Sequence, residues 1–110
     1  MAYRSFQYVV SGSVQGVGFR HFTKRMADRE GIVGWVKNDS SGEVVGIAQG
    51  PEHALQRFKQ EIENGPRHAS VSGVRLTSEE PIDSLHEKLQ SSVNSVTELQ
   101  ELARRVTLFT

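Results

Sequence analysis

The chain has 110 residues, enough for one domain with a single hydrophobic core. Hydrophobic residues make up 36% and charged residues 24%, as in ordinary globular proteins, which argues against a disordered chain. The 13 Lys and Arg residues balance the 13 Asp and Glu residues, so the sequence lacks the positive charge of a protein that grips a nucleic acid or an anionic membrane.

The sequence also limits the redox chemistry and the compartment. It contains no cysteine, which excludes disulfides, thiolate nucleophiles and zinc sites built on cysteine. The first residues, MAYRSFQYVV, lack the basic and apolar segments of a signal peptide, and no run approaches the ~20 apolar residues of a membrane span. We therefore expect a cytoplasmic protein with no membrane and no nucleic-acid partner.

The first half of the chain alternates between strand and helix patterns. Residues 4–11 alternate aromatic and β-branched side chains with polar ones and predict a strand. Residues 21–30 carry apolar side chains at helical spacing before a glycine and predict a helix. Two apolar runs, 32–38 and 43–50, are separated by Asp-Ser-Ser-Gly, which predicts a β-hairpin.

The second half adds one helix and one strand. A helix with one apolar face is predicted to open at Pro51 and to stop at the Asn-Gly-Pro of residues 64–66. Residues 69–76 predict a fourth strand. The order βαββαβ predicts an α+β protein with the split β-α-β, ferredoxin-like sandwich, in which two helices cover one face of a mostly antiparallel sheet.

The C-terminal part has a different character. We expect residues 1–80 to form the ferredoxin-like domain and residues 81–110 to form an atypical tail, within the same domain or appended to it. Ser95 followed by Glu98 resembles a capping box and predicts a helix over about 96–105. The final Val-Thr-Leu-Phe is suited to a short strand.

The stretch GSVQGVGFRHFTKRM, residues 12–26, indicates a binding site for an anion. It places three glycines within seven residues, directly before Phe19 and Arg20. Glycine removes the Cβ wall, so successive backbone N–H groups can converge on one anion, and the positive end of a following helix faces the same point. The segment predicts an oxyanion cradle with a guanidinium at its mouth, although a tight turn with a merely solvated arginine is an alternative.

Two common glycine-rich loops are excluded. A Walker loop ends in Gly-Lys-Ser/Thr, whereas Gly18 is followed by Phe-Arg-His. The dinucleotide-binding fingerprint needs a third small residue where His21 stands. The four histidines are far apart and have no metal-ligand spacing. A loop for a single phosphoryl group is the remaining interpretation.

Two motifs together resemble a known family. GSVQGVGFR and GWVKN, residues 34–38, occur in this order about 20 residues apart and are similar to the acylphosphatase family, small ferredoxin-like enzymes that hydrolyse carboxyl-phosphate bonds. The similarity continues through the hairpin, the Gln-Gly-Pro before the second helix and the Asn-Gly-Pro after it. It covers residues 5 to about 80.

The resemblance implies a substrate and a set of roles. It implies that Asn38 orients the attacking water and that the phosphate is held by the Arg20 side chain and by the loop amides of Gln15, Gly16, Val17, Gly18 and Phe19. It implies a small-molecule acyl phosphate as substrate, affinity for phosphate or sulfate ion, and a reaction with no cofactor, no metal and no covalent phosphoenzyme. An uncharged amide suits the role of Asn38, because it both accepts and donates without repelling the phosphate.

Alternatives remain at this point. The family usually ends in a fifth strand; here that strand could be the final Val-Thr-Leu-Phe, or the tail could cover the sheet edge as a helix, form a dimer or stay disordered. We favour a helical tail and a monomer.

The function also has alternatives to a standalone enzyme. The chain could be a non-catalytic phosphate- or anion-binding module, or a domain like that of larger carbamoyl-transfer proteins. Asn38 favours the enzyme, because a pure anion binder needs no water-orienting amide.

Overall fold

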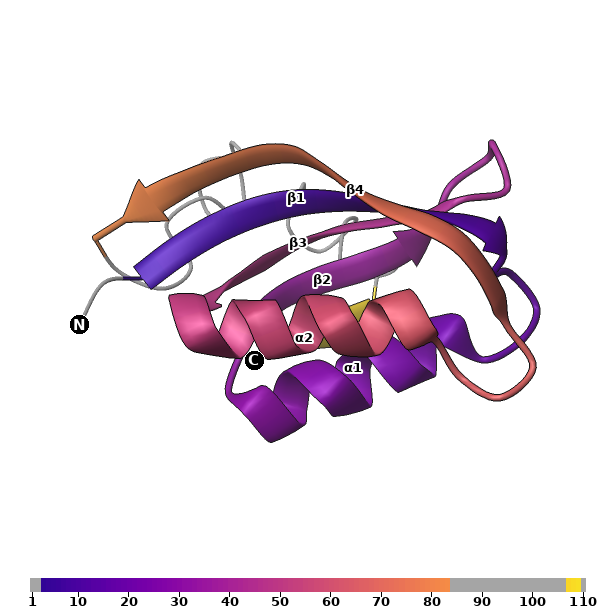
Figure 1. Ribbon diagram of the computed structural model, residues 1–110, viewed down its shortest axis with the longest axis horizontal. Helices are drawn as coiled ribbons and strands as arrows, with labels where there is room; N and C mark the ends of the chain where they lie inside the picture. The colour runs from indigo at the N-terminus through magenta and orange to yellow at the C-terminus, as the bar shows by residue number, and fades with distance from the viewer. Residues whose placement is uncertain (1–2, 84–106, 110) are drawn as a thin grey trace, which may run out of the picture.

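The computed structural model describes residues 3–83 and 107–109. The described chain forms a five-stranded antiparallel sheet in the order β4-β1-β3-β2-β5, with two helices on one face (Figure 1). The elements are β1 (Tyr3–Ser13), α1 (Phe19–Glu30), β2 (Val33–Asn38), β3 (Val44–Pro51), α2 (Glu52–Asn64), β4 (Ser70–Ile82) and β5 (Thr107–Phe109). This order confirms the predicted ferredoxin-like α+β arrangement.

Two elements are longer than predicted. Helix α1 begins at Phe19 rather than at residue 21, because Gly18 adopts a left-handed conformation and its carbonyl oxygen accepts a hydrogen bond from Phe22 N at 3.0 Å. Strand β4 continues to Ile82 rather than stopping at residue 76, because it pairs with β1 along its whole length. Pro81 is tolerated there since β4 is an edge strand of the described sheet.

The C-terminal strand that the sequence suggested is present. Strand β5 pairs antiparallel with β2, with Thr107 opposite Val36 and Phe109 opposite Gly34. The predicted tail helix over 96–105 lies outside the described residues.

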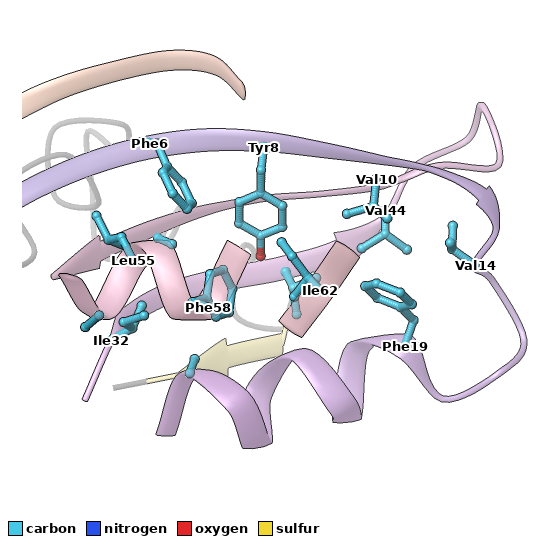
Figure 2. Close-up of a cluster of buried hydrophobic side chains, with 14 residues drawn as sticks. Phe6, Tyr8, Val10, Val14, Phe19, Ile32, Val44, Leu55, Phe58 and Ile62 are labelled. Carbon is cyan, nitrogen blue, oxygen red and sulfur yellow. The ribbon is translucent and has the colours of Figure 1, made fainter. Parts of the chain in front are cut away.

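The core lies between the helices and the sheet. Figure 2 shows Phe6, Tyr8 and Val10 pointing from β1 toward the helix layer, as expected for alternate residues of one strand. The rings of Tyr8 and Phe58 meet edge to face at 5.8 Å between centroids. Because apolar residues of both helices pack on this face, burial of the amphipathic faces holds the two layers together.

Ion pairs join the two helices on their outer side. Arg57 Nε and Nη2 both lie 2.7 Å from Glu30 Oε1, and Arg29 Nη2 lies 3.4 Å from Glu61 Oε1. The hydrogen bond from Arg57 is the main reason why the pKa of Glu30 lies below its ordinary value. These pairs add surface contacts between α1 and α2, while the packing itself rests on the buried apolar faces.

The strand directions place two chain segments at the same end of the sheet. Both β1 and β2 run antiparallel to β3, so they are parallel to each other on either side of it. Val10 and Asn38 both pair with Val44. Adjacent strands are about 4.8 Å apart, so Val10 lies roughly 10 Å from Asn38, and the segment that follows β1 continues at this end of the sheet.

Candidate active site

The segment between β1 and α1 is anchored by three apolar side chains. The side chains of Val14 and Phe19 are buried, with exposed fractions of 1% and 2%. Val17, which lies between them in the chain, packs against the core. Figure 2 shows Val14 and Phe19 at the end of the core nearest this loop. Gly16 and Gly18 are exposed and have φ angles of 75° and 77°, values that favour glycine. The loop therefore has a fixed apolar base and an open backbone surface.

Gly12, the first glycine of the motif, has another purpose. A Cβ atom there would lie 2.1 Å from the carbonyl oxygen of Ser70 and 2.7 Å from the backbone nitrogen of Ser72. Nothing lies within 4 Å of a Cβ built on Gly16 or Gly18. The three glycines thus divide between the packing of β1 against β4 and the shape of the loop.

The N-terminal end of α1 opens beside the same loop. Gly18 has no side chain to cap the helix, and the first turn contains no acidic residue, so the positive end of α1 is not neutralised locally. Arg20 is exposed in that first turn. Within residues 3–83 and 107–109 it pairs with no carboxylate, which leaves its fork of N–H donors available for an anion.

A pocket of about 230 Å³ lies at this end of the sheet. Its lining residues come from the loop, from the first turn of α1 and from the end of β2, and they are Val14, Gly16, Gly18, Phe19, Arg20, His21 and Asn38. The parallel directions of β1 and β2 bring Asn38 to the loop, although it lies 18 positions after Arg20 in the sequence. A guanidinium, an amide and glycine backbone thus share one pocket.

Two of the predicted phosphate-binding residues are absent from this lining. The side chain of Val17 packs into the core, and the side chain of Gln15 extends to the β2–β3 hairpin, where its Nε2 donates to two carbonyl oxygens. Their roles concern the backbone and are untouched by these side-chain positions. His21, which directly follows Arg20, is exposed and also lines the pocket, although it was not among the predicted site residues.

The hairpin carboxylates are satisfied locally. Asp39 accepts hydrogen bonds from the Oγ of Ser41 at 2.6 Å and from its backbone nitrogen at 3.3 Å, and the hydroxyl bond is the main cause of a pKa below the usual aspartate value. Glu43 accepts from the Oγ of Ser11 at 2.6 Å, which in turn lowers its pKa. Neither Asp39 nor Glu43 lines the pocket. Of the described residues 38–43, Asn38 is the one that does.

Two kinds of feature are absent from the part of the chain that the structure describes. Residues 3–83 and 107–109 contain no group of three or more His, Asp or Glu side chains placed to hold a metal ion. Neither described helix has the length and the apolar character needed to cross a lipid bilayer.

This geometry defines the class of the protein: a small ferredoxin-like α+β protein with one pocket suited to an oxyanion. The sequence profile of the acylphosphatase family matches residues 6–101. The chain is 40% identical over 81 residues to an acylphosphatase of Bacillus subtilis, covering 74% of this chain and 89% of the relative. It is 40% identical over 86 residues to one of Moorella thermoacetica, covering 78% and 92%. The crystal structure of acylphosphatase from Bacillus subtilis superposes with a TM-score of 0.67 at 39% identity, covering 76% of this chain and 90% of that one.

The chain belongs to the acylphosphatase family. It is an enzyme of that kind, a hydrolase whose substrates are small-molecule acyl phosphates. The resemblance inferred from the two sequence motifs is thereby confirmed.

Proposed function

We propose that the pocket between the β1–α1 loop and Asn38 is the catalytic centre, and that it works by holding the phosphoryl group and orienting one water molecule. The observation that carries this proposal is the presence of Arg20 and Asn38 in the lining of a single pocket. The loop amides from Gln15 to Phe19 bind the phosphoryl oxygens together with Arg20. Asn38 holds the water.

The phosphoryl side of the pocket suits a charged oxyanion. Left-handed glycines at positions 16 and 18 let neighbouring N–H groups face one point, and the positive end of α1 adds to their field. The Arg20 guanidinium donates two parallel N–H bonds to phosphoryl oxygens. In a loose phosphoryl-transfer transition state, charge spreads over these oxygens, so preorganised donors lower the barrier.

Asn38 reaches the pocket from the end of β2. Its amide oxygen accepts a hydrogen bond from the water, which aims the water oxygen at phosphorus. That oxygen forms a bond to phosphorus as the bond from phosphorus to the acyl oxygen breaks, and the electron pair leaves with the carboxylate. Both protons of the water remain on the phosphate product. An acyl carboxylate is a good leaving group, so correct placement of the water suffices and no strong base is required.

The size of the pocket supports recognition of the phosphate more than of the acyl group. At about 230 Å³ it is smaller than the roughly 300–1,000 Å³ of pockets that enclose drug-sized ligands. We propose that the phosphoryl group enters while the acyl group extends into solvent, which permits several acyl phosphates as substrates. Inorganic phosphate and sulfate then bind as product-like ions.

The wider setting is part of the same proposal. The lining comes from residues 14–38, so the proposed site lies within the domain of residues 1–80, and the tail of residues 81–110 contributes β5 beside β2. We propose that the protein acts as a monomer. The balanced charge and the lack of cysteine support action in the cytoplasm without a nucleic-acid partner.

The test is hydrolysis of benzoyl phosphate in excess EDTA by the wild type and by Arg20→Ala and Asn38→Ala. Each substitution should lower kcat/KM by about 10²–10³-fold, the usual cost of removing one preorganised donor. Matched controls are Arg25→Ala, elsewhere on α1, and Asn64→Ala, at the end of α2; both should keep wild-type turnover.

Phosphate binding separates the two roles. Inorganic phosphate should raise the Tm of the wild type and of Asn38→Ala, but not of Arg20→Ala. Wild-type turnover in either site variant would refute its role. Loss of phosphate protection in Asn38→Ala would make Asn38 a binding residue rather than a water-orienting one.

A further inference from the structure

The side chain of Gln15 forms a contact that phosphate binding by its backbone does not explain. Its Nε2 donates one hydrogen bond to the carbonyl oxygen of Asp39 at 2.7 Å and another to that of Glu43 at 2.9 Å. A primary amide has two N–H donors, so both are used on the same hairpin. Gln15 directly precedes Gly16, which lines the pocket, and Asp39 directly follows Asn38.

The two carbonyl oxygens are the groups that close the hairpin turn. Asp39 N donates to the carbonyl oxygen of Glu43 at 2.7 Å, and Gly42 N donates to that of Asp39 at 3.1 Å. Each carbonyl has a second lone pair, which the Gln15 amide occupies. One side chain of the loop thus holds both ends of the turn that begins at Asn38.

A second contact joins the same two segments. Ser11 Oγ, near the end of β1, donates to Glu43 Oε2 at 2.6 Å, and the Oγ of Ser41 lies 3.1 Å from Glu43 Oε1. The Glu43 carboxylate therefore links Ser11 of β1 to Ser41 of the hairpin. The bonds from Gln15 are the ones that reach the residue next to Asn38.

We infer that Gln15 is a positioning residue, whose side chain sets the distance between the phosphate-binding loop and the water held by Asn38. This inference rests on the proposed function of Asn38. In-line attack requires the water oxygen at a defined distance from phosphorus, and a displacement of about 1 Å costs up to roughly 10²-fold in rate. The loop binds phosphate through its own amides and Arg20, so loss of the Gln15 side chain moves the water relative to the phosphate without removing the anion site.

The test compares Gln15→Met, which keeps the length of the side chain and removes its donors, with the wild type on benzoyl phosphate. We expect kcat to fall at least about tenfold while the inhibition constant of inorganic phosphate changes less than about threefold. The contact is exposed, so Tm should stay close to that of the wild type. Gln60→Met, the same change at an exposed site on α2, is the matched control and should have no effect.

A double-mutant cycle shows whether Gln15 acts through Asn38. In an Asn38→Ala background, Gln15→Met should lower kcat less than about threefold further, because there is no oriented water left to displace. Should Gln15→Met fold poorly, Gln15→Asn replaces it, since an amide shorter by one methylene cannot span both carbonyls.

The possible failures are distinguishable. Equal losses from Gln15→Met in both backgrounds, or equal changes in kcat and phosphate affinity, overturn the positioning role and leave that of Asn38 intact. A wild-type kcat in Asn38→Ala overturns the proposed function, and the positioning role with it.

Discussion

Tyr8 and Trp35 are joined across the middle strand of the sheet: the Tyr8 hydroxyl donates to the Trp35 carbonyl oxygen at 3.2 Å. Tyr8 lies on β1 and Trp35 on β2, and β3 runs between them with Gly46 paired to Tyr8. Full burial raises the pKa of Tyr8 well above its usual value, so the phenol remains a neutral donor. The contact is possible because Gly46 has no side chain.

Gly46→Ala should therefore destabilise the fold strongly. The new Cβ would lie 2.2 Å from the Trp35 carbonyl oxygen and 2.3 Å from the Tyr8 hydroxyl, so a backbone atom must move. We expect a loss of about 2–3 kcal/mol in the free energy of unfolding, measured by urea denaturation. Gly73→Ala on β4, where nothing lies within 4 Å of the added Cβ, is the matched control and should be close to neutral. Similar losses in both variants would contradict the steric explanation.

The motif glycines should separate by phenotype. Gly12→Ala places a Cβ 2.1 Å from the Ser70 carbonyl oxygen and should abolish or severely weaken folding. In Gly16→Ala the added Cβ would have no atom within 4 Å. The cost is the strain of an alanine in a left-handed conformation, about 1–2 kcal/mol, and relief of that strain would change the shape of the loop. We expect the second variant to fold and to lose phosphate binding, as seen by the Tm shift with inorganic phosphate. A Gly16→Ala protein with full phosphate protection would contradict the proposed cradle.

Arg20→Lys tests the shape of the cation. Lysine keeps the positive charge and loses the planar fork, so it makes one point contact where arginine makes two parallel bonds. We expect kcat/KM for benzoyl phosphate to fall between about 10-fold and 10²-fold, less than for Arg20→Ala. Equal activity of the lysine variant and the wild type would show that charge alone is sufficient.

The ion pair between the helices should give a pH-dependent stability. Arg57 holds the pKa of Glu30 below its ordinary value of 4.5, so the pair stabilises the folded state above that pH and its contribution disappears as the pH falls through the folded pKa. Glu30→Gln should lower Tm by a few degrees at most at pH 7. The difference from the wild type should shrink and then vanish as the pH falls from 4.5 through the lowered folded-state pKa of Glu30. A difference that persists in acid would assign the effect to packing.

Removal of residues 107–110 should uncover β2. Strand β5 pairs with Gly34 to Val36, so its loss leaves β2 as an edge strand and removes backbone hydrogen bonds beside the Asn38 segment. We expect a lower Tm, with turnover retained at temperatures where the protein stays folded, because the pocket is lined by residues 14–38. Deletion of Thr110 alone serves as the control. An unchanged Tm in the longer truncation would show that β5 adds nothing to the stability of the sheet.

Local sequence patterns were sufficient to predict the helices and strands and most of the residues that line the pocket. Alternation predicted β1, helical spacing predicted α1 and α2, and four turn formers predicted the hairpin. The resemblance of two motifs selected Arg20 and Asn38, and the structure brings both to one pocket. Their roles in catalysis remain predictions.

The features that the sequence did not predict depend on contacts between segments that are far apart in the chain. The length of β4 depends on its partner β1, from which it is separated by two helices and a hairpin, so the polar residues after position 76 gave no strand signal. The Gln15 side chain finds its two acceptors only because β1, β3 and β2 stand in one register. Gly12 looked like a loop glycine, because its close approach to Ser70 is visible only in three dimensions.

The position of β1 between β4 and β3 has a consequence for how the enzyme becomes active. This strand precedes the other described elements in the sequence, its partners β3 and β4 come later in the chain, and Tyr3 pairs with Ile82. Contacts between such distant segments require large loops to close and make folding slow. Because the glycine-rich loop is held between β1 and α1, it takes its shape only when those contacts form. Recovery of activity after dilution from denaturant should follow the same slow phase as the recovery of structure.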